Sequence, residues 1–369
     1  MNNPPAPVTR QESLRTFYYN NKGMLILSTI VTSVISIITG VAATTFCNVD
    51  GNCRATGPPP EPGAIVAQPE PGTTGAPPES EPDPRRAYLM SLITERSPST
   101  DFSTASQALE WTWTDEYSEG WELLENNDDF DDRMVQRFGL ASLFYITKGF
   151  KWIDGYRDGW LDSKKPACDW NMNDISCAAG FEVSALDLSG GNLFGSLPVE
   201  VGLLTELTSL DLSANQLESS IPFELHQLFE LISLNLSDNQ LTTLIWRELG
   251  LLTKLTSLNL YANQLEEYIP AELGLLTKLT LLDLYANKLT GYIPFELGLL
   301  TELTSLDLSA NKLTGFIPAE LGLLTKLEWL DLSNNQLTGT IPSSLCSPAV
   351  SFSFDCYRIT CNCCWNCFF

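Results

Sequence analysis

A column of acidic side chains is the part of this sequence with the clearest potential for chemistry. One Asp or Asn stands between the two leucines of a Leu-x-Leu motif that recurs every 24 residues. The members are Asp187, Asp211, Asn235, Asn259, Asp283, Asp307 and Asp331. On parallel strands about 4.8 Å apart, the last three carboxylates would stand roughly as far apart as those of a retaining glycosidase. We favour a solvated acidic ladder produced by repeat copying, because no further catalytic residues accompany the column; weak cation binding is a third interpretation.

Histidine and the other acidic residues add little to this chemistry. The single histidine, His226, is too few for most metal sites and leaves little scope for a Ser-His-Asp triad. A calcium loop at Asp128–Asp132 would lack the glycine and the terminal glutamate of an EF-hand, so a solvated acidic surface is favoured there. We therefore predict no catalytic residue, no metal site and no cofactor, and we expect a protein that is not an enzyme.

The ten cysteines indicate an oxidising compartment. Six of them follow the last repeat: Cys346, Cys356, Cys361, Cys363, Cys364 and Cys367. These thiols could bind zinc, but in an exported chain three disulfides that seal the end of the fold are favoured. Their pairing cannot be read from the spacing. Cys47 and Cys53 pair either with each other or across a dimer.

One glycosylation motif is present, Asn235-Leu236-Ser237. It lies in the acidic column, so we predict a glycan on Asn235 that obstructs part of that face. An occupied site would disfavour a grip on a large ligand there.

The elements that position these groups follow from the repeat itself. From about Val183 to Leu345 the leucines recur with the same step as the acidic column, and the asparagines are spaced 23 and then five times 24 residues apart. The asparagines are Asn192, Asn215, Asn239, Asn263, Asn287, Asn311 and Asn335. Each Leu-x-Leu places two leucines on the buried side of a short strand, and one coil cannot bury them alone. The spacing predicts an α/β solenoid of about seven coils, with a parallel sheet on its concave face.

Two aromatic columns are the predicted ligand contacts. Tyr261 and Tyr285 follow the strand motif, with Trp329 on the same face. In the column just before the Ile-Pro position, four successive coils carry Leu244, Tyr268, Tyr292 and Phe316. Exposed aromatic anchors mark interfaces, so all seven are candidate ligand-binding residues. The open alternative is that these side chains pack on one another and stabilise the coils.

The middle coils depart from the repeat. Ser219, Thr243 and Glu267 replace a glycine found at the same position in other coils. Trp246 stands in a proline position, and His226 stands in a second glycine position. We favour tolerated drift over a partner-specific adaptation.

The N-terminal segments predict export. Residues 1–22 are polar with a basic excess, and 23–46 contain an uncharged apolar stretch, 24–43, long enough for a helix to cross a bilayer. We predict a single-pass protein with a cytosolic N-terminus, a signal-anchor in the lipid bilayer and an extracellular remainder. The alternative is a signal peptide cleaved after Val41-Ala42-Ala43. Residues 47–84 form a proline-rich stalk.

Residues 85–182 are predicted to be an acidic helical region and an N-terminal cap, with helices over 86–96, 105–126 and 133–147. Residues 346–369 form the cysteine-rich C-terminal cap. The net charge of −24 argues against nucleic acid and anionic lipid surfaces as partners, because too few basic residues are present to neutralise phosphates.

The unit N-x-L-T-G-x-I-P-x-E-L-G-L-L-T-x-L-x-x-L-x-L resembles the plant-type leucine-rich repeat (LRR) of receptor-like proteins and receptor kinases. Residues 133–177 resemble the N-terminal cap of that family, which implies a Cys168–Cys177 disulfide. The layout is most similar to single-pass LRR proteins predicted in diatoms, which share the tail, span, proline-rich spacer and terminal cysteines.

The resemblance implies a non-catalytic, membrane-anchored receptor-like protein. Its expected partners are an extracellular protein, peptide or polysaccharide. A membrane co-receptor is expected as well, since no kinase follows the repeats. The alternative function is a structural or adhesive protein of the cell wall or matrix.

Overall fold

The computed structural model describes residues 46–47, 53–54, 84–114, 128–162, 165–170, 174–178, 182–346 and 350–361. The chain divides into two compact units, Met1–Ala76 and Pro77–Phe369. In the first, β1 (Phe46–Cys47) pairs antiparallel with β2 (Cys53–Arg54), so that Cys47 lies opposite Cys53. The predicted tail, anchor and most of the stalk lie outside the described residues. Among the described helices, none has the length and apolar character needed to span a membrane.

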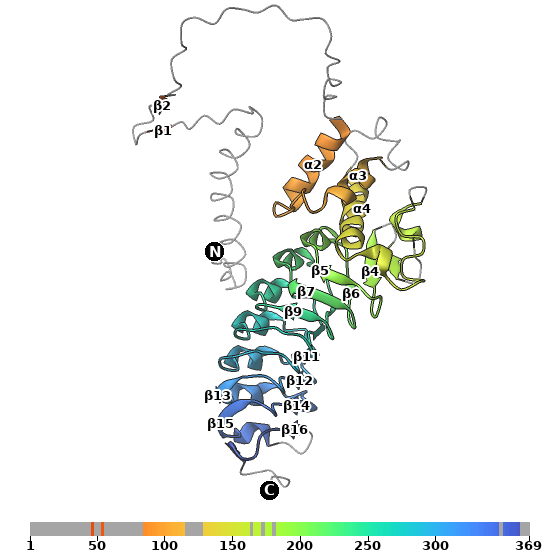
Figure 1. Ribbon diagram of the computed structural model, residues 1–369. Coiled ribbons are helices and arrows are strands. Elements are labelled where there is room, and N and C mark those ends of the chain that lie inside the picture. Colours follow the sequence, from red (N-terminus) through yellow and green to blue (C-terminus); the bar gives the residue numbers. More distant parts are fainter. Residues whose placement is uncertain are drawn as a thin grey trace, which may run out of the picture. The chain divides into compact units, whose positions relative to one another are not determined.

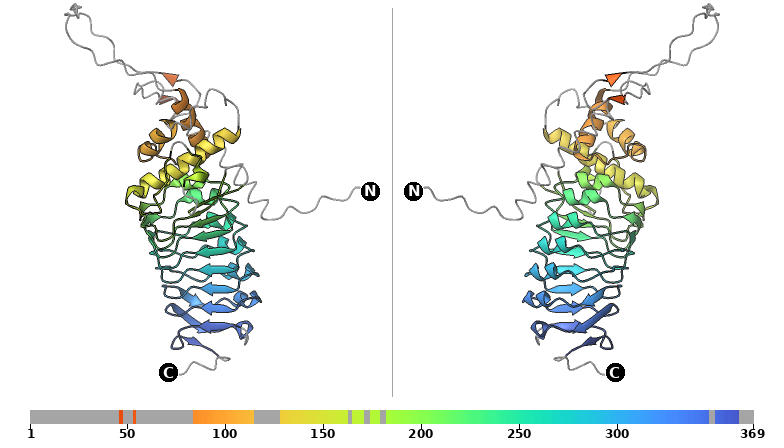
Figure 2. Two further views of the ribbon diagram at one scale, coloured as in Figure 1. Left: turned by 90° about the vertical axis from the view of Figure 1, so that its right-hand side faces the viewer. Right: turned by 90° about the vertical axis from the view of Figure 1, so that its left-hand side faces the viewer.

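The second unit is built on a sheet of nine strands that runs the length of a stack of coils (Figures 1 and 2). In spatial order the strands are β16 (Ser351–Ser353), β14 (Trp329–Asp331), β12 (Ser305–Asp307), β11 (Leu281–Asp283), β10 (Ser257–Asn259), β8 (Ser233–Asn235), β6 (Ser209–Asp211), β4 (Val183–Asp187) and β3 (Ile175–Cys177). Equivalent residues pair in register, as Leu258 does with Leu282. The α/β solenoid with a parallel sheet is therefore confirmed over the repeats.

The first strand breaks the parallel rule. β3 runs antiparallel to β4, with Ile175 opposite Leu186. Because β3 enters from the N-terminal cap and not from a coil, it can turn back along the first repeat strand and cover its open edge. The side chain of Gln136 completes this edge by accepting a hydrogen bond from the Val183 N–H at 2.7 Å.

Short 3₁₀ helices form the side of the stack opposite this sheet (Figure 1). They are η4 (Val199–Leu203), η5 (Phe223–Gln227), η6 (Arg247–Leu251), η7 (Ala271–Leu275), η8 (Phe295–Leu299), η9 (Ala319–Leu323) and η10 (Ser343–Leu345). In the first six of these helices the fourth residue occupies the same repeat position. It is glycine in five of them and His226 in η5. A Cβ at Gly298 would lie 2.4 Å from the Glu320 carbonyl oxygen, so glycine lets adjacent coils approach.

A second ladder lies on the flank between the concave strands and the 3₁₀ helices. It forms two separate sheets. One contains β5 (Phe194–Ser196), β7 (Gln216–Ser220) and β9 (Gln240–Thr242), and the other contains β13 (Thr314–Phe316), β15 (Gln336–Thr340) and β17 (Ile359–Thr360). A single bridge, Tyr268 to Thr290, lies between the two sheets. We call this surface the lateral face.

The asparagines hold the coils together inside the turn that leaves each concave strand. The Asn287 Oδ1 accepts a hydrogen bond from the Leu265 N–H of the preceding coil at 3.0 Å. Its Nδ2 donates to the Leu260 carbonyl at 2.9 Å and to the Leu284 carbonyl at 3.2 Å. Equivalent bonds recur from Asn215 to Asn335, all buried, so a polar column satisfies the backbone next to a leucine core.

The N-terminal cap is helical, with α2 (Pro84–Arg96), α3 (Ser106–Thr114) and α4 (Asp128–Ile146). α4 packs on η4 at the end of the stack, where Leu203 joins the core of the helices. α4 begins earlier than the predicted helix at 133, so the acidic run Asp128–Asp132 lies on helical backbone and not in a cation-binding loop. Arg96 pairs with Asp132 and ties α2 to α4.

Aromatic rings and one disulfide complete this cap. The Arg137 guanidinium lies 4.9 Å from the centre of the Trp170 ring and donates to the Lys165 carbonyl at 2.7 Å. Cys168 is bonded to Cys177, the pair that the family resemblance implied. The cap thereby joins α4, the 3₁₀ turn at Ala167–Asp169 and β3 into one end piece.

Candidate functional site

The acidic column of the concave face is used by the backbone. Each Asp or Asn accepts a hydrogen bond from the N–H two residues later, as Asp307 Oδ1 does from Ser309 at 2.9 Å. The Ser309 hydroxyl donates to the same oxygen at 2.6 Å. This Asx turn recurs at every coil from Asp187 to Asp331. The Asp-x-Ser pattern is therefore a device that ends the strand.

Asp283 differs because Tyr285 stands where most coils have serine. Only the Tyr285 N–H bonds to its carboxylate, at 3.0 Å. Burial raises the pKa of Asp283, the Tyr285 N–H opposes that shift, and the charge of Asp307 adds to it. Among the described residues, no three His, Cys, Asp or Glu side chains come together in a way that could hold a metal ion.

The glycosylation motif lies inside this network. Asn235 Nδ2 donates to Asp211 Oδ2 at 2.9 Å, and its Oδ1 accepts from the Ser237 hydroxyl at 2.7 Å. Asn235 is half-buried and Ser237 is buried. A glycan on Asn235 would replace the bond to Asp211; its presence stays a prediction.

The concave aromatic residues lie partly in the sheet surface. The Tyr261 and Tyr285 ring centres are 6.4 Å apart and tilted by 38°. Tyr285 and Trp329 have 43% and 45% of their surface exposed, whereas Tyr261 is half-buried. Tyr285 and Trp329 stand in different columns and on coils that are not adjacent, so they do not form one continuous patch.

The lateral face carries the most exposed aromatic side chains of the described repeats. Tyr268, Tyr292 and Phe316 are exposed over 62%, 72% and 73% of their surface. They stand on three consecutive coils, and we call them the lateral stripe. Leu244, the fourth predicted member, is half-buried. Phe295, three residues after Tyr292, is 60% exposed and extends the stripe toward the 3₁₀ helices; the sequence reading did not include it.

Two rings of the stripe are each matched to a glycine in the following coil. A Cβ at Gly315 would lie 2.3 Å from the Tyr292 ring, and one at Gly339 would lie 2.5 Å from the Phe316 ring. Both glycines have a left-handed backbone, with φ of 81° and 98°. The aromatic rings therefore occupy space that only glycine leaves free, while most of each ring stays in solvent.

Beside the stripe, three outward positions recur across neighbouring coils. Lys288, Thr290 and Tyr292 are exposed or half-buried and stand around a buried leucine. Lys312, Thr314 and Phe316 repeat this arrangement one coil later. Sequence reasoning missed the lysines and threonines, although the Lys-x-Thr-x-aromatic alternation was visible. We call these two rows the lateral triads.

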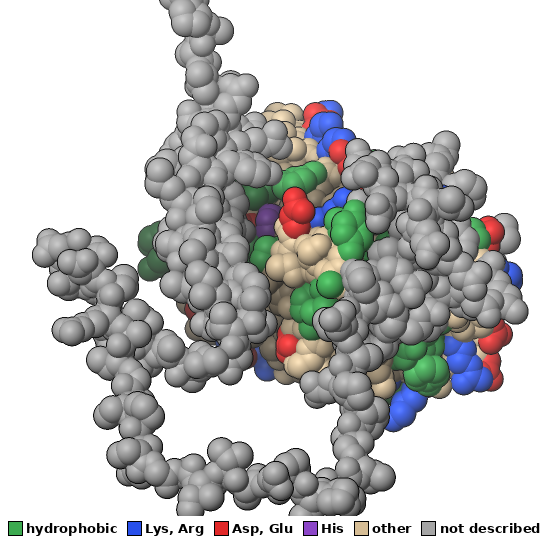
Figure 3. Space-filling model, turned by 90° about the horizontal axis from the view of Figure 1, so that it is seen from above, with side chains coloured by type: hydrophobic (Ala, Val, Ile, Leu, Met, Phe, Trp, Pro, Cys, Tyr) green, Lys and Arg blue, Asp and Glu red, His purple; other side chains and the backbone are tan. Residues whose placement is uncertain are grey.

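Charge elsewhere is mixed. On the described part of the face in Figure 3, acidic and basic side chains lie beside one another and form no basic patch. Along the opposite edge of the concave sheet, Lys254 pairs with Glu230 and Lys326 pairs with Glu302. Such exposed pairs contribute little to stability and offer nothing to a polyanion.

Sequence comparison identifies the repeat. Profiles described as leucine-rich repeats match residues 277–337, 206–228 and 230–252. The solenoid is built of leucine-rich repeats. Among curated protein sequences no match was found.

Solved LRR structures are similar to the chain. It is 36% identical to the LRR ectodomain of the plant membrane receptor kinase GASSHO1/SCHENGEN3 from Arabidopsis thaliana, over 53% of this chain and 26% of that one, with a TM-score of 0.48. It is 30% identical to the Arabidopsis receptor kinase HAESA, solved with the peptide hormone IDA and the co-receptor SERK1, over 62% of this chain and 42% of that one, with a TM-score of 0.50. The chain spans less than half the length of these receptor chains.

The unusual residues of two adjacent irregular LRR coils pack against a shared phenylalanine. The buried His226 ring packs on Phe223 with centres 4.5 Å apart, and Phe223 in turn meets the Trp246 ring at 5.6 Å. The Trp246 indole N–H donates to the Ile221 carbonyl at 2.7 Å. A histidine in a glycine position and a tryptophan in a proline position thus form one packed cluster across two coils, which is a structural reason for the departure.

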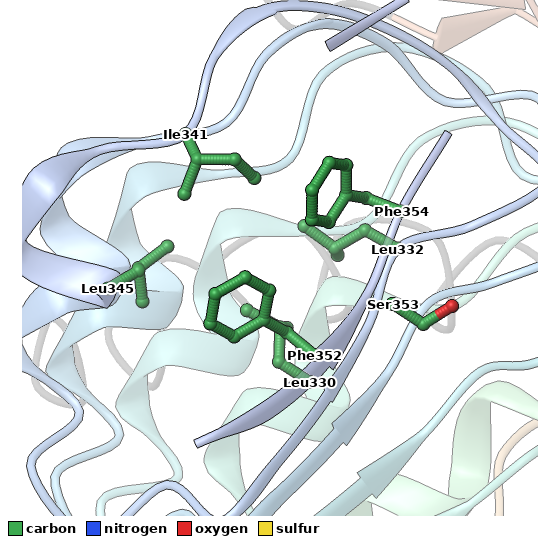
Figure 4. Close-up of a pocket in the computed structure, with 7 residues that line it drawn as sticks. All are labelled: Leu330, Leu332, Ile341, Leu345, Phe352, Ser353 and Phe354. Carbon is green, nitrogen blue, oxygen red and sulfur yellow. The ribbon is translucent and has the colours of Figure 1, made fainter. Parts of the chain in front are cut away.

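The last LRR coil ends in an apolar hollow, lined by Leu330, Leu332, Ile341, Leu345, Phe352, Ser353 and Phe354 (Figure 4). Phe352 pairs in register with Leu330, so the leucine motif continues once more with phenylalanine. Cys346, Cys356 and Cys361 are disulfide-bonded. Cys363, Cys364 and Cys367 lie outside the described residues. The hollow belongs to the closing end of the core, and among the described residues that line it Ser353 is the one polar side chain.

Proposed function

We propose that the chain is a non-catalytic, membrane-anchored LRR recognition protein whose contact surface is the lateral stripe. The exposure of Tyr268, Tyr292 and Phe316 on consecutive coils carries this proposal. Large aromatic side chains contribute most when a partner covers them, and they lose little conformational entropy on binding.

The lateral face is a better contact surface than the concave one. On the concave face the carboxylates already accept hydrogen bonds from their own turns, as Asp211 does from Ser213 and Asn235. A glycan on Asn235 would obstruct that face further. Within the described residues, most of the surface of each stripe ring stays exposed, so a partner gains the burial of that surface.

Similarity to a receptor ectodomain supports recognition as the function. HAESA, which matches with a TM-score of 0.50, was solved with a peptide hormone and a co-receptor. A membrane co-receptor therefore belongs to the proposal, together with an extracellular protein, peptide or polysaccharide ligand. The apolar stretch 24–43 and the Cys168–Cys177 disulfide support an anchored protein with its repeats outside the cytosol.

Catalysis is not part of the proposal. The carboxylates that would serve a glycosidase are held by Asx turns, and Asp307 accepts two hydrogen bonds from Ser309. Asp307→Asn keeps the acceptor oxygen of this turn. It should leave any activity of the protein unchanged, and loss of a hydrolytic activity with this variant would contradict the proposal.

Affinity capture tests the contact surface. The full-length protein in detergent is compared with a Tyr268→Ser, Tyr292→Ser, Phe316→Ser variant. A control carries Leu299→Ser and Leu323→Ser, which remove apolar side chains exposed over 52% and 56% on the 3₁₀ side. We expect a discrete partner with the native protein and the control, and none with the stripe variant.

The opposite results are equally informative. Equal recovery by the stripe variant would reject the stripe as the contact surface. Recovery of only bulk wall polymer by all three proteins would favour a structural or adhesive wall protein over a receptor.

A further inference from the structure

We propose that the lateral triads bind an uncharged, linear polysaccharide that runs along the axis of the solenoid. This inference rests on the proposed function and names its ligand class. It is carried by three observations: a repeated arrangement of side chains, the absence of acids from those rows, and the exposure of their rings.

Repetition is the first argument. Lys288, Thr290 and Tyr292 are followed one coil later by Lys312, Thr314 and Phe316. Neighbouring coils are about 4.8 Å apart, a step close to the length of one extended pyranose unit. A surface that offers the same cation, hydroxyl and ring at each step fits a polymer with the same hydroxyls and ring at each unit. A peptide of varied sequence gains nothing from such repetition.

The side chains have the chemistry that a sugar requires. The Thr290 and Thr314 hydroxyls donate to backbone carbonyls of the preceding coil at 3.2 Å, which leaves their oxygens as acceptors for sugar hydroxyls. The Lys288 ammonium donates to Gln264 Oε1 at 3.0 Å, and its other two N–H groups can donate to sugar oxygens, as those of Lys312 can. The Tyr292 and Phe316 rings, with most of their surface in solvent, give the apolar contact that the C–H groups of a pyranose need.

Charge selects an uncharged polymer over an acidic one. The stretches 286–292 and 310–316 contain no Asp or Glu in a chain whose net charge is −24. Two lysines do not offset the long-range repulsion that this charge exerts on a polyanion, and Lys288 already lies 3.8 Å from Glu266. An uncharged chain meets the acid-free rows without that penalty.

Native affinity electrophoresis tests the proposal on the full-length protein in non-ionic detergent. Gels contain hydroxyethylcellulose, and mobility is compared with gels that lack it. We expect the native protein to be retarded and Tyr292→Ser, Phe316→Ser to lower the retardation constant about tenfold. Leu299→Ser, Leu323→Ser is the control for equal loss of exposed apolar surface, and all these changes leave the net charge unaltered.

Two further variants separate recognition from folding. Thr314→Val keeps the shape of the side chain and removes its oxygen, so the retardation constant should fall several-fold while thermal stability stays the same. Tyr292→Phe keeps the ring and should retain retardation. Equal retardation of the stripe variant and the control would overturn the proposal.

Competition distinguishes this inference from the proposed function. Retardation relieved by free cellohexaose supports an uncharged β-linked chain. Binding of polygalacturonate instead, lost with Lys312→Glu and kept with Lys278→Glu, would overturn the uncharged ligand; Lys278 is an exposed lysine outside the lateral face. A captured protein that needs the stripe, with no retardation by hydroxyethylcellulose, would reject the polysaccharide and leave the recognition function standing.

Discussion

The two halves of the solenoid make the same lateral turn in different ways. In the N-terminal half, Ser219, Thr243 and Glu267 adopt a left-handed backbone, with φ of 69°, 71° and 65°. The same position is glycine in the C-terminal half, at Gly291, Gly315 and Gly339, and in the first coil, at Gly195. Side chains with a Cβ are strained in this region, so the N-terminal half has the more costly backbone.

The difference lies in what the glycine admits. Where the turn residue has a side chain, the preceding coil carries Ser196, Ser220 or Leu244 at the stripe position. Where the turn residue is Gly291, Gly315 or Gly339, the preceding coil carries an aromatic residue of the stripe. The aromatic surface is thus a property of pairs of coils, and one half of the protein specialises in structure while the other offers a contact surface.

Removal of a shared feature should affect both halves equally. Asn239→Ala and Asn287→Ala each delete a buried amide that bonds to backbone groups of two coils. We expect each to lower the free energy of unfolding by about 3 kcal/mol, because buried backbone groups lose their partners. Guanidinium unfolding followed by circular dichroism measures this. Unequal losses would show that the halves differ in more than their lateral turns.

Gly315→Ala should damage the C-terminal half specifically. The new Cβ would meet the Tyr292 ring and would occupy a left-handed backbone, at an expected cost of about 2 kcal/mol. Combining it with Tyr292→Ala should recover the steric part of that cost but not the backbone part. A double-mutant cycle with zero coupling would disprove contact between ring and glycine.

The N-terminal cap, next to the first coil, contains a buried carboxylate that makes stability depend on pH. Burial, reinforced by the charge of Asp187, raises the pKa of Asp174 from 3.8 to about 6. The folded state then binds the proton more tightly than the unfolded state, so the free energy of unfolding should rise as the pH falls from about 7 toward 4. Asp174→Asn should flatten this profile by about 1–2 kcal/mol. An unchanged profile in urea melts would count against the burial of this charge.

Thr243→Gly should make the N-terminal half resemble the other. Glycine adopts the left-handed backbone without strain, so we expect a gain of roughly 0.5–1 kcal/mol in the free energy of unfolding. The shift in the guanidinium midpoint measures the effect. A destabilised variant would mean that the Thr243 side chain makes contacts that outweigh its backbone strain.

The repeat and its core could be read from the sequence because they depend on period alone. The leucine spacing predicts which side chains are buried, and the asparagine spacing predicts where the turns follow the strands. The Asx turns were not predicted, although the Asp-x-Ser pattern occurs in most coils. The acidic residues of the strand were considered as solvated carboxylates and not as acceptors of backbone hydrogen bonds. The antiparallel β3 depends on how the cap docks, which no repeat period contains.

The candidate site was predicted only in part. Exposure of Tyr268, Tyr292 and Phe316 agrees with their position in the repeat, whereas the half-buried state of Leu244 and Tyr261 depends on neighbouring coils. His226 and Trp246 were interpreted as drift, because two separate departures from a motif do not reveal that both pack against Phe223. Contacts across coils are invisible to a reading that follows one coil at a time.

The order of glycine and aromatic residue along the chain affects how the number of coils can increase by duplication during evolution. Gly291 directly precedes Tyr292, and Gly315 directly precedes Phe316. The Tyr292 and Phe316 rings each lie against the glycine of the next coil. A duplicated coil therefore supplies a glycine that accommodates the ring of the coil before it. It also supplies a new ring that the glycine of the following coil accommodates. The series starts with a ring that follows Glu267 and stops at Gly339, which Thr340 follows. Duplication of one coil can therefore lengthen the stripe by one aromatic residue, and the ring–glycine contacts between coils need no further substitution.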